Sequence, residues 1–266
     1  MKYAFMTFSC PDWNLDEVLA AAQRYGYDGV ELRIDANHKH SVELGNSAAQ
    51  RAAAKAKVAA SNVALCCVAT SCKFADPTLA AQNVTAAREQ INLAADLGAG
   101  ALRVFGGQIP TGVTREQAID SLVQSLAALA EQAAARGVQI ALETHDDWCD
   151  PQHVQTVVSR VNHSNIGVNW DYQHTTRVAK TSVDEAFNLL RPYIRHVHFH
   201  DGTLAADKLE FLPIGQGAYD HARVLALLQS IDYRGYLSGE WINWEPADVH
   251  LPRELAAIKQ LEPDAA

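Results

Sequence analysis

The chain repeats one pattern of apolar and polar positions. An Ala- and Leu-rich segment ends near a Gly, and a short apolar segment follows, as seen at 18–34, 89–107, 122–144 and 225–241. The long segments predict helices, and the Gly near each helix end suits the left-handed position that terminates a helix. The short segments, such as GVELRI and VQIALE, are apolar nearly throughout. This is typical of strands in a parallel sheet that helices cover on both faces.

The pattern predicts eight strands with helices between them. They are expected near 2–8, 29–34, 62–69, 100–106, 138–144, 165–171, 194–200 and 235–241. Eight such units in 266 residues predict a (β/α)8 barrel, or TIM barrel, as a single α/β domain over 1–266. The alternative is an open doubly wound sheet, but the sequence has neither a GxGxxG motif after the first strand nor a P-loop.

Charge and cysteine content narrow the partners that we expect. The net charge of −9 disfavours nucleic acid and anionic membranes. No apolar run approaches the roughly 18 residues that a membrane helix needs. The five cysteines are odd in number and irregularly spaced, which favours reduced thiols in a cytoplasmic protein.

Carboxylates and imidazoles follow the apolar part of the last four predicted strands. They are Glu143, then Asp171 and His174, then His196, His198, His200 and Asp201, and finally Glu240. In a barrel, the carboxyl ends of the strands converge on one mouth. Burying so many unpaired charges would be costly, and a bound divalent cation would offset that cost. A carboxylate-rich site with an imidazole suits Mn, Mg, Co or Zn.

These segments also carry a family resemblance. The motifs ALETH, WDYQH, HVHFHD, LPIGQGAYD and GYLSGEW resemble those of the xylose isomerase-like barrel superfamily, the sugar phosphate isomerase/epimerase group, and GYDGVELR and LRVFGG agree more loosely. The resemblance implies that Glu143, Asp171, His198 and Glu240 bind one divalent metal. It also implies that Glu143 and Glu240 form the catalytic acid/base pair and that His174 contacts the substrate.

Other polar residues near the predicted strand ends have less defined roles. We expect His200 to line the substrate pocket, and Arg103 either to contact the substrate or to pair with a neighbouring carboxylate. His196 is expected to be a hydrogen-bonded core residue, and Glu31 is a candidate for contact with the metal ligands. His145 would face away from the barrel interior if its strand continues that far. Asp171 could instead cap the following helix.

The expected function is a metal-dependent sugar or sugar phosphate isomerase or epimerase. It would work through an enediolate, with the two glutamates moving protons on a small-molecule carbohydrate. The alternative on the same site is a dehydratase of a polyol ketone, of the inosose or dehydroshikimate type. An endonuclease IV-like repair enzyme is disfavoured because the third strand lacks His, and a non-catalytic binding protein is disfavoured by the complete ligand set. Assembly into a homo-oligomer stays open, since dimers are common among soluble enzymes.

Overall fold

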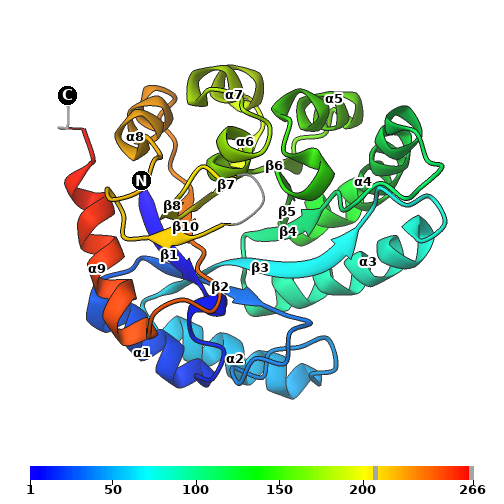
Figure 1. Ribbon diagram of the computed structural model, residues 1–266. Helices are drawn as coiled ribbons and strands as arrows, with labels where there is room; N and C mark the ends of the chain where they lie inside the picture. Colours follow the sequence, from blue (N-terminus) through cyan, green and yellow to red (C-terminus); the bar gives the residue numbers. More distant parts are fainter. Residues whose placement is uncertain (206–208, 264–266) are drawn as a thin grey trace.

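Eight parallel strands close into a barrel in the computed structural model, which describes residues 1–205 and 209–263 (Figure 1). The strands are β1 (Lys2–Met6), β2 (Gly29–Arg33), β3 (Ala64–Lys73), β4 (Ala101–Phe105), β5 (Gln139–Glu143), β6 (Ile166–Asp171), β7 (Ile194–Phe199) and β10 (Tyr236–Gly239). β1 pairs with both β2 and β10, which completes the ring. The predicted (β/α)8 barrel is therefore confirmed, and each of its eight predicted strands is present.

The strand boundaries lie within two residues of the prediction, except for the end of β3. β1 ends at Met6 because Thr7–Ser9 turn into a short 3-10 helix, η1. β3 runs on to Lys73, where alternate residues such as Ser71 are exposed. Because polar residues alternate with buried ones at this end, the search for continuous apolar segments does not detect the continuation of β3.

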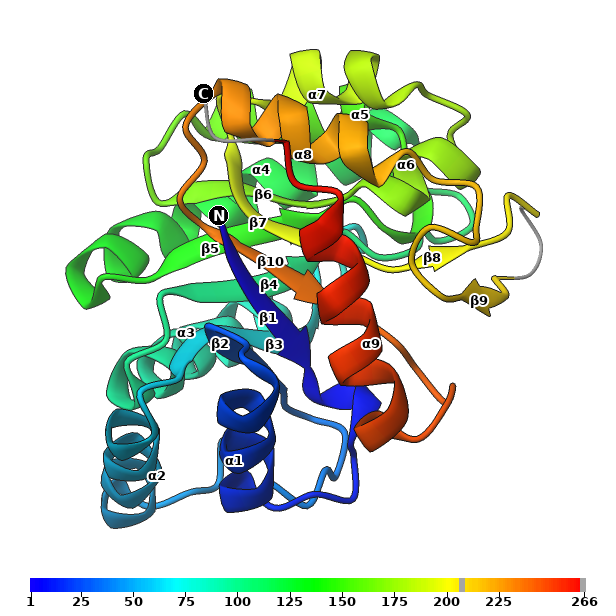
Figure 2. The ribbon, with the colours of Figure 1, turned by 90° about the vertical axis from the view of Figure 1, so that its left-hand side faces the viewer.

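Helices form a ring outside the strands (Figures 1 and 2). They are α1 (Leu15–Tyr25), α2 (Ala48–Ser61), α3 (Ala80–Leu97), α4 (Arg115–Arg136), α5 (Pro151–Val161), α6 (Tyr172–Arg177), α7 (Val183–Leu190), α8 (His221–Ser230) and α9 (Ala247–Gln260). Two minor strands, β8 (Asp201–Gly202) and β9 (Phe211–Leu212), form a hairpin beyond the end of β7. α9 packs against α1, and the hydroxyl of Tyr27 donates to the carbonyl of Leu251, which ties the last unit to the first.

The predicted helix ends hold in three of four repeats. Gly26, Gly98 and Gly137 follow α1, α3 and α4 in the left-handed conformation, at φ of 84°, 85° and 69°. The prediction is wrong for Gly235. α8 ends earlier, and its cap Ile231 has a φ of −106°, so Gly235 lies in the turn before β10.

Alternate strand residues divide the core into two parts. On β7, Val197 and Phe199 belong to the apolar core between sheet and helices, so the residues between them face the barrel axis. The same alternation turns a set of buried polar residues toward the axis: Glu31, Arg103, Glu143, Asn169, Asp171, His196, His198, His200 and Ser238. A cluster of buried polar groups thus lies inside the barrel, toward its carboxyl end.

All five cysteines are buried and free. Among the residues that the structure describes, no helix has the length and apolar character needed to cross a membrane.

Candidate metal centre

The four predicted metal ligands lie together at the carboxyl end of the barrel. Glu143 and Asp171 are the last residues of β5 and β6, His198 is the last but one of β7, and Glu240 directly follows β10. One oxygen or nitrogen of each residue lies within 4.8 Å of those of the other three. All four are buried. Closure of the barrel alone brings them together, because each comes from a different βα unit.

His198 lies at the middle of this group. Its Nδ1 is 3.0 Å from Oε1 of Glu143 and 3.2 Å from Oε2 of Glu240. β7 lies between β10 on one side and β6 and β5 on the other, so the two glutamates reach the same ring nitrogen from strands on opposite sides of β7.

Asp171 divides its two oxygens between two tasks. Oδ1 accepts hydrogen bonds from the backbone N–H groups of Gln173 and His174, both at 3.0 Å, and so caps α6. Oδ2 makes no hydrogen bond to any residue that the structure describes, and the nearest imidazole nitrogen, Nε2 of His174, is 3.7 Å away. A buried carboxylate oxygen without a donor is the kind of group that a cation satisfies.

The charges of the centre do not balance within the protein. Arg103 forms a buried ion pair with Glu143, its Nε lying 3.2 Å from Oε2. Three carboxylates against one guanidinium leave two negative charges, which equals the charge of one divalent cation. The residues present therefore fit a divalent metal in number, charge and donor type.

The electrostatics of the protein alone reflect this crowding. Burial, together with the charges of Glu143 and Glu240, raises the pKa of Asp171 to about 7. Burial lowers the pKa of His198, but the carboxylates of Glu31, Glu143 and Glu240 outweigh it and hold that pKa well above its usual value. Without a metal, protons on these two groups are the means of relieving the repulsion.

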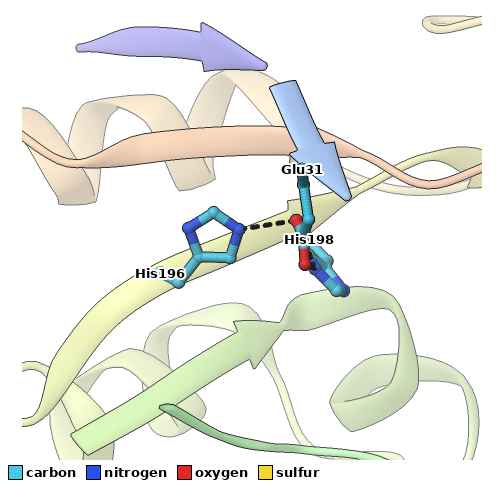
Figure 3. Close-up of side chains that lie close together, drawn as sticks. All are labelled: Glu31, His196 and His198. Carbon is cyan, nitrogen blue, oxygen red and sulfur yellow. Dashed lines mark hydrogen bonds and ion pairs between the residues drawn. The ribbon is translucent and has the colours of Figure 1, made fainter. Parts of the chain in front are cut away.

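A second buried group adjoins the first through the other side of His198. Nε2 of His198 lies 3.1 Å from Oε2 of Glu31, and Nε2 of His196 lies 2.8 Å from the same oxygen (Figure 3). The expectation that His196 is a hydrogen-bonded core residue is confirmed. Glu31 contacts a predicted metal ligand, as its position in the sequence suggested.

The predicted substrate contacts lie in two places. The His174 ring packs against the rings of His145 and His200, with centroids 4.5 and 6.4 Å away. Burial lowers the pKa of both His174 and His200 to about 3, so both imidazoles are neutral near pH 7. Arg103 is fully buried and, besides its ion pair with Glu143, donates from Nη1 to the carbonyl of Thr70 at 2.8 Å. The structure therefore has the carboxylate pairing that was one of its two expected roles.

Two features of this region were not anticipated from the sequence. β5 ends at Glu143, and His145 does not point away but lies against Phe105 and His174. The carboxylate of Asp201 accepts hydrogen bonds from the backbone N–H groups of Gly215 and Gly217. It thereby fixes the segment 212–217, part of the LPIGQGAYD motif, beside the end of β7.

Comparison with known proteins places the chain in a family. The model of the xylose isomerase-like TIM barrel family matches residues 19–262. The chain is 22% identical over 165 residues to 3-dehydroshikimate dehydratase of Bacillus anthracis, which is 56% of this chain and 58% of that protein. It is 26% identical over 275 residues to L-ribulose 3-epimerase of Methylomonas sp. (strain DH-1), covering 96% of this chain and 88% of that protein. The chain thus spans little more than half the length of the first curated relatives it matches.

A solved structure with a bound sugar has the same fold. D-allulose 3-epimerase from Methylomonas sp. in complex with D-allulose superimposes with a TM-score of 0.78 at 20% identity, over 98% of this chain and 96% of that chain. At this identity the likeness establishes the fold, while the family model matches nearly the whole chain. The protein belongs to the xylose isomerase-like TIM barrel family.

Proposed function

We propose that this protein is a divalent-metal-dependent epimerase or isomerase of a small ketose or related sugar. The observation that carries the proposal is the buried set of three carboxylates and one imidazole, which together with Arg103 leaves two negative charges that one divalent cation would balance. The relatives named as L-ribulose 3-epimerase and D-allulose 3-epimerase support a sugar substrate with a carbonyl group.

Glu143 and Glu240 are the proposed acid/base pair. A divalent cation, when bound, supplies a Lewis acid beside the substrate carbonyl. One glutamate removes the proton from the carbon next to the carbonyl, and the enediolate of the substrate results. The other glutamate returns a proton from the opposite side and inverts that carbon, or a proton returns to the neighbouring carbon and exchanges aldose for ketose. The two glutamates come from opposite sides of β7 and both approach Nδ1 of His198, which supports this division of work.

Burial and charge set the ionisation of these two groups. Burial opposes the charge on Glu240, but His198 and Arg103 outweigh it and lower its pKa to about 2. Burial likewise opposes the charge on Glu143, and Arg103 and His198 again lower the pKa. Both glutamates are therefore ionised near pH 7, so either can serve as the base, and the one that returns a proton to the substrate must first take that proton from solvent or from a substrate hydroxyl.

A dehydratase acting on a polyol ketone is the second candidate. The same proton removal, followed by departure of a hydroxide from the next carbon, releases water and leaves an enone. The match to 3-dehydroshikimate dehydratase of Bacillus anthracis supports it. The neutral imidazoles of His174 and His200, beside the carboxylates, provide polar groups that can bind additional hydroxyls.

The test combines metal content with proton exchange. The protein, purified without chelator, is assayed for bound metal and then incubated in deuterated water with ketoses, inososes and 3-dehydroshikimate, with and without added Mn²⁺. We expect about one divalent ion per chain and metal-dependent deuterium incorporation next to the carbonyl. Product of unchanged mass apart from deuterium supports the epimerase or isomerase, and loss of one water supports the dehydratase. A protein that binds no divalent metal and exchanges no proton on these compounds contradicts the proposal.

A further inference from the structure

Glu31 connects the first half of the barrel to the metal centre. It comes from β2, is fully buried, and lies between two imidazoles of β7 (Figure 3). Its Oε2 is 2.8 Å from Nε2 of His196 and 3.1 Å from Nε2 of His198, and its Oε1 is 3.2 Å from the latter nitrogen. Both oxygens thus face the same ring nitrogen of His198, on the side away from Glu143 and Glu240.

The chemistry of the carboxylate fixes which ring nitrogens carry hydrogen. An ionised carboxylate can only accept hydrogen bonds, so Nε2 of His196 and Nε2 of His198 must both donate. A neutral imidazole has one N–H, which for His198 is then on Nε2. Its lone pair is consequently on Nδ1, the atom 3.0 Å from Oε1 of Glu143. Such a lone pair beside two carboxylates is repelled unless a cation lies between them.

These contacts also explain why the second group needs no metal of its own. Glu31, His196 and His198 have the residue types of a cation site. However, the carboxylate of Glu31 already receives an N–H from each of the two imidazoles, which leaves its charge compensated by hydrogen bonds. His196 occupies Oε2 from the other side and so limits the positions that the carboxylate can adopt.

We propose that Glu31 is a positioning residue that holds His198 in the tautomer and orientation in which Nδ1 binds the metal. The inference rests on the proposed metal centre. It assigns to Glu31 a contribution to metal binding that does not depend on the substrate. Metal-binding histidines commonly donate their other ring N–H to a carboxylate, and loss of that partner weakens metal affinity by about 10–100-fold.

The experiment measures Mn²⁺ affinity of the full chain by calorimetric titration after removal of bound metal. Glu31→Asp keeps the charge but withdraws the carboxylate from His198 by one methylene, whereas Glu31→Gln keeps the length and loses the charge. Glu254→Asp is the matched control, because Glu254 is also a fully buried carboxylate but lies on α9 and accepts from the backbone N–H of Ile214. We expect Mn²⁺ to bind about 10–100-fold more weakly to Glu31→Asp than to wild type, and the control to bind as wild type does.

The outcomes separate the inference from the proposed function. If wild type binds no Mn²⁺, the proposed metal centre itself is wrong. If wild type binds Mn²⁺ and Glu31→Asp matches it, the positioning role is overturned, and weak binding by Glu31→Gln alone would then reflect loss of charge.

A second readout does not depend on any variant folding. In wild type loaded with Zn²⁺, ¹⁵N–¹H correlation spectra of the imidazoles should show His198 protonated at Nε2, with Nδ1 bound to metal. A His198 protonated at Nδ1 in that spectrum would contradict the inference directly.

Discussion

The two halves of the barrel differ in where they carry charge. The strands of the second half end in residues that point into the proposed centre, namely Glu143, Asp171, His198 and Glu240. The first half instead contributes Glu31 and Arg103, which lie two residues before the ends of β2 and β4. Each of these contacts a residue of the second half, His198 for Glu31 and Glu143 for Arg103.

This difference indicates a division of labour. The second half holds the groups that would touch metal and substrate, and the first half sets the position and charge of those groups from deeper in the barrel. Substitutions in the second half should therefore abolish chemistry, whereas substitutions in the first half should weaken it in graded ways.

The largest effect is expected at Glu240. Glu240→Gln removes a proposed proton carrier and should reduce metal-dependent deuterium exchange into substrate by about 10²–10⁴-fold. The control is Glu131→Gln, since the Glu131 side chain on α4 is 94% exposed and should leave exchange unchanged. Exchange at the wild-type rate in Glu240→Gln would refute the acid/base assignment.

Two aspartates of the second half sharpen the contrast between a proposed metal ligand and a structural carboxylate. Asp201 accepts from the backbone N–H groups of Gly202, Gly215 and Gly217, and its Oδ2 lies 3.1 Å from Nε2 of His221. Because hydrogen bonds to a charged group are strong, Asp201→Asn should cost about 2 kcal/mol or more. That loss corresponds to a melting temperature lower by roughly 5 °C.

Asp171→Asn provides the comparison for that measurement. Its Oδ1 can still cap α6, and the charge that it loses is one of three crowded carboxylates, so the metal-free protein should melt at or above the wild-type temperature. Thermal denaturation in the presence of chelator measures both variants. A large destabilisation by Asp171→Asn would mean that its carboxylate is structural, like that of Asp201.

The sequence predicts the strands well, and it predicts the second half of the site better than the first. The apolar runs locate the strands, and charge at the end of four of them marks residues that barrel closure brings together. Glu31 and His196 are 165 residues apart, and no local sequence pattern predicts their contact. Arg103 lies inside an apolar strand, and its partner Glu143 comes from the neighbouring strand, so the local sequence around Arg103 does not indicate the pair.

Errors in the prediction have local causes. His145 was expected to face away from the interior, but strand alternation already places a residue two positions after Glu143 on the same side as Glu143, and the His145 ring lies against Phe105 and His174. The β8–β9 hairpin consists of two-residue strands, which are too short to produce an alternating pattern.

A smaller effect is expected at Arg103. Kinetics of a variant can distinguish its two expected roles, which are contact with the substrate and pairing with a neighbouring carboxylate. Arg103→Lys keeps the charge but cannot reproduce both the ion pair to Glu143 and the hydrogen bond to the carbonyl of Thr70. If Arg103 positions Glu143, kcat should fall by about 10-fold while KM changes little. A rise in KM at constant kcat would instead identify a direct substrate contact. Steady-state kinetics on the substrate found by deuterium exchange decides between them.

The smallest effect tests whether the first half also contributes stability through neutral groups. His40, between β2 and α2, is buried, with Nε2 3.0 Å from the carbonyl oxygen of Arg33 and Nδ1 accepting from the N–H of Val42. Burial lowers the pKa of His40 from 6.5 to about 4. The hydrogen bond to the carbonyl of Arg33 partly opposes this shift, and the nearby His38 adds to it.

The sign of the pH dependence follows from that shift. The unfolded chain binds a proton to His40 near pH 6.5 but the folded chain does so only near pH 4. Stability from this residue is therefore complete above pH 6.5 and is lost as the pH falls toward 4.

His40→Gln keeps a side-chain N–H donor and cannot titrate. Between pH 7 and 5 the free energy of unfolding of this variant should therefore decline less than that of wild type, with a difference on the order of 1 kcal/mol. Urea denaturation with chelator present measures this difference, and His153→Gln, at a partly exposed histidine of α5, controls for the loss of a histidine elsewhere. Equal declines in wild type and His40→Gln would show that the first half does not depend on a neutral His40, and that its contribution is confined to the contacts of Glu31 and Arg103.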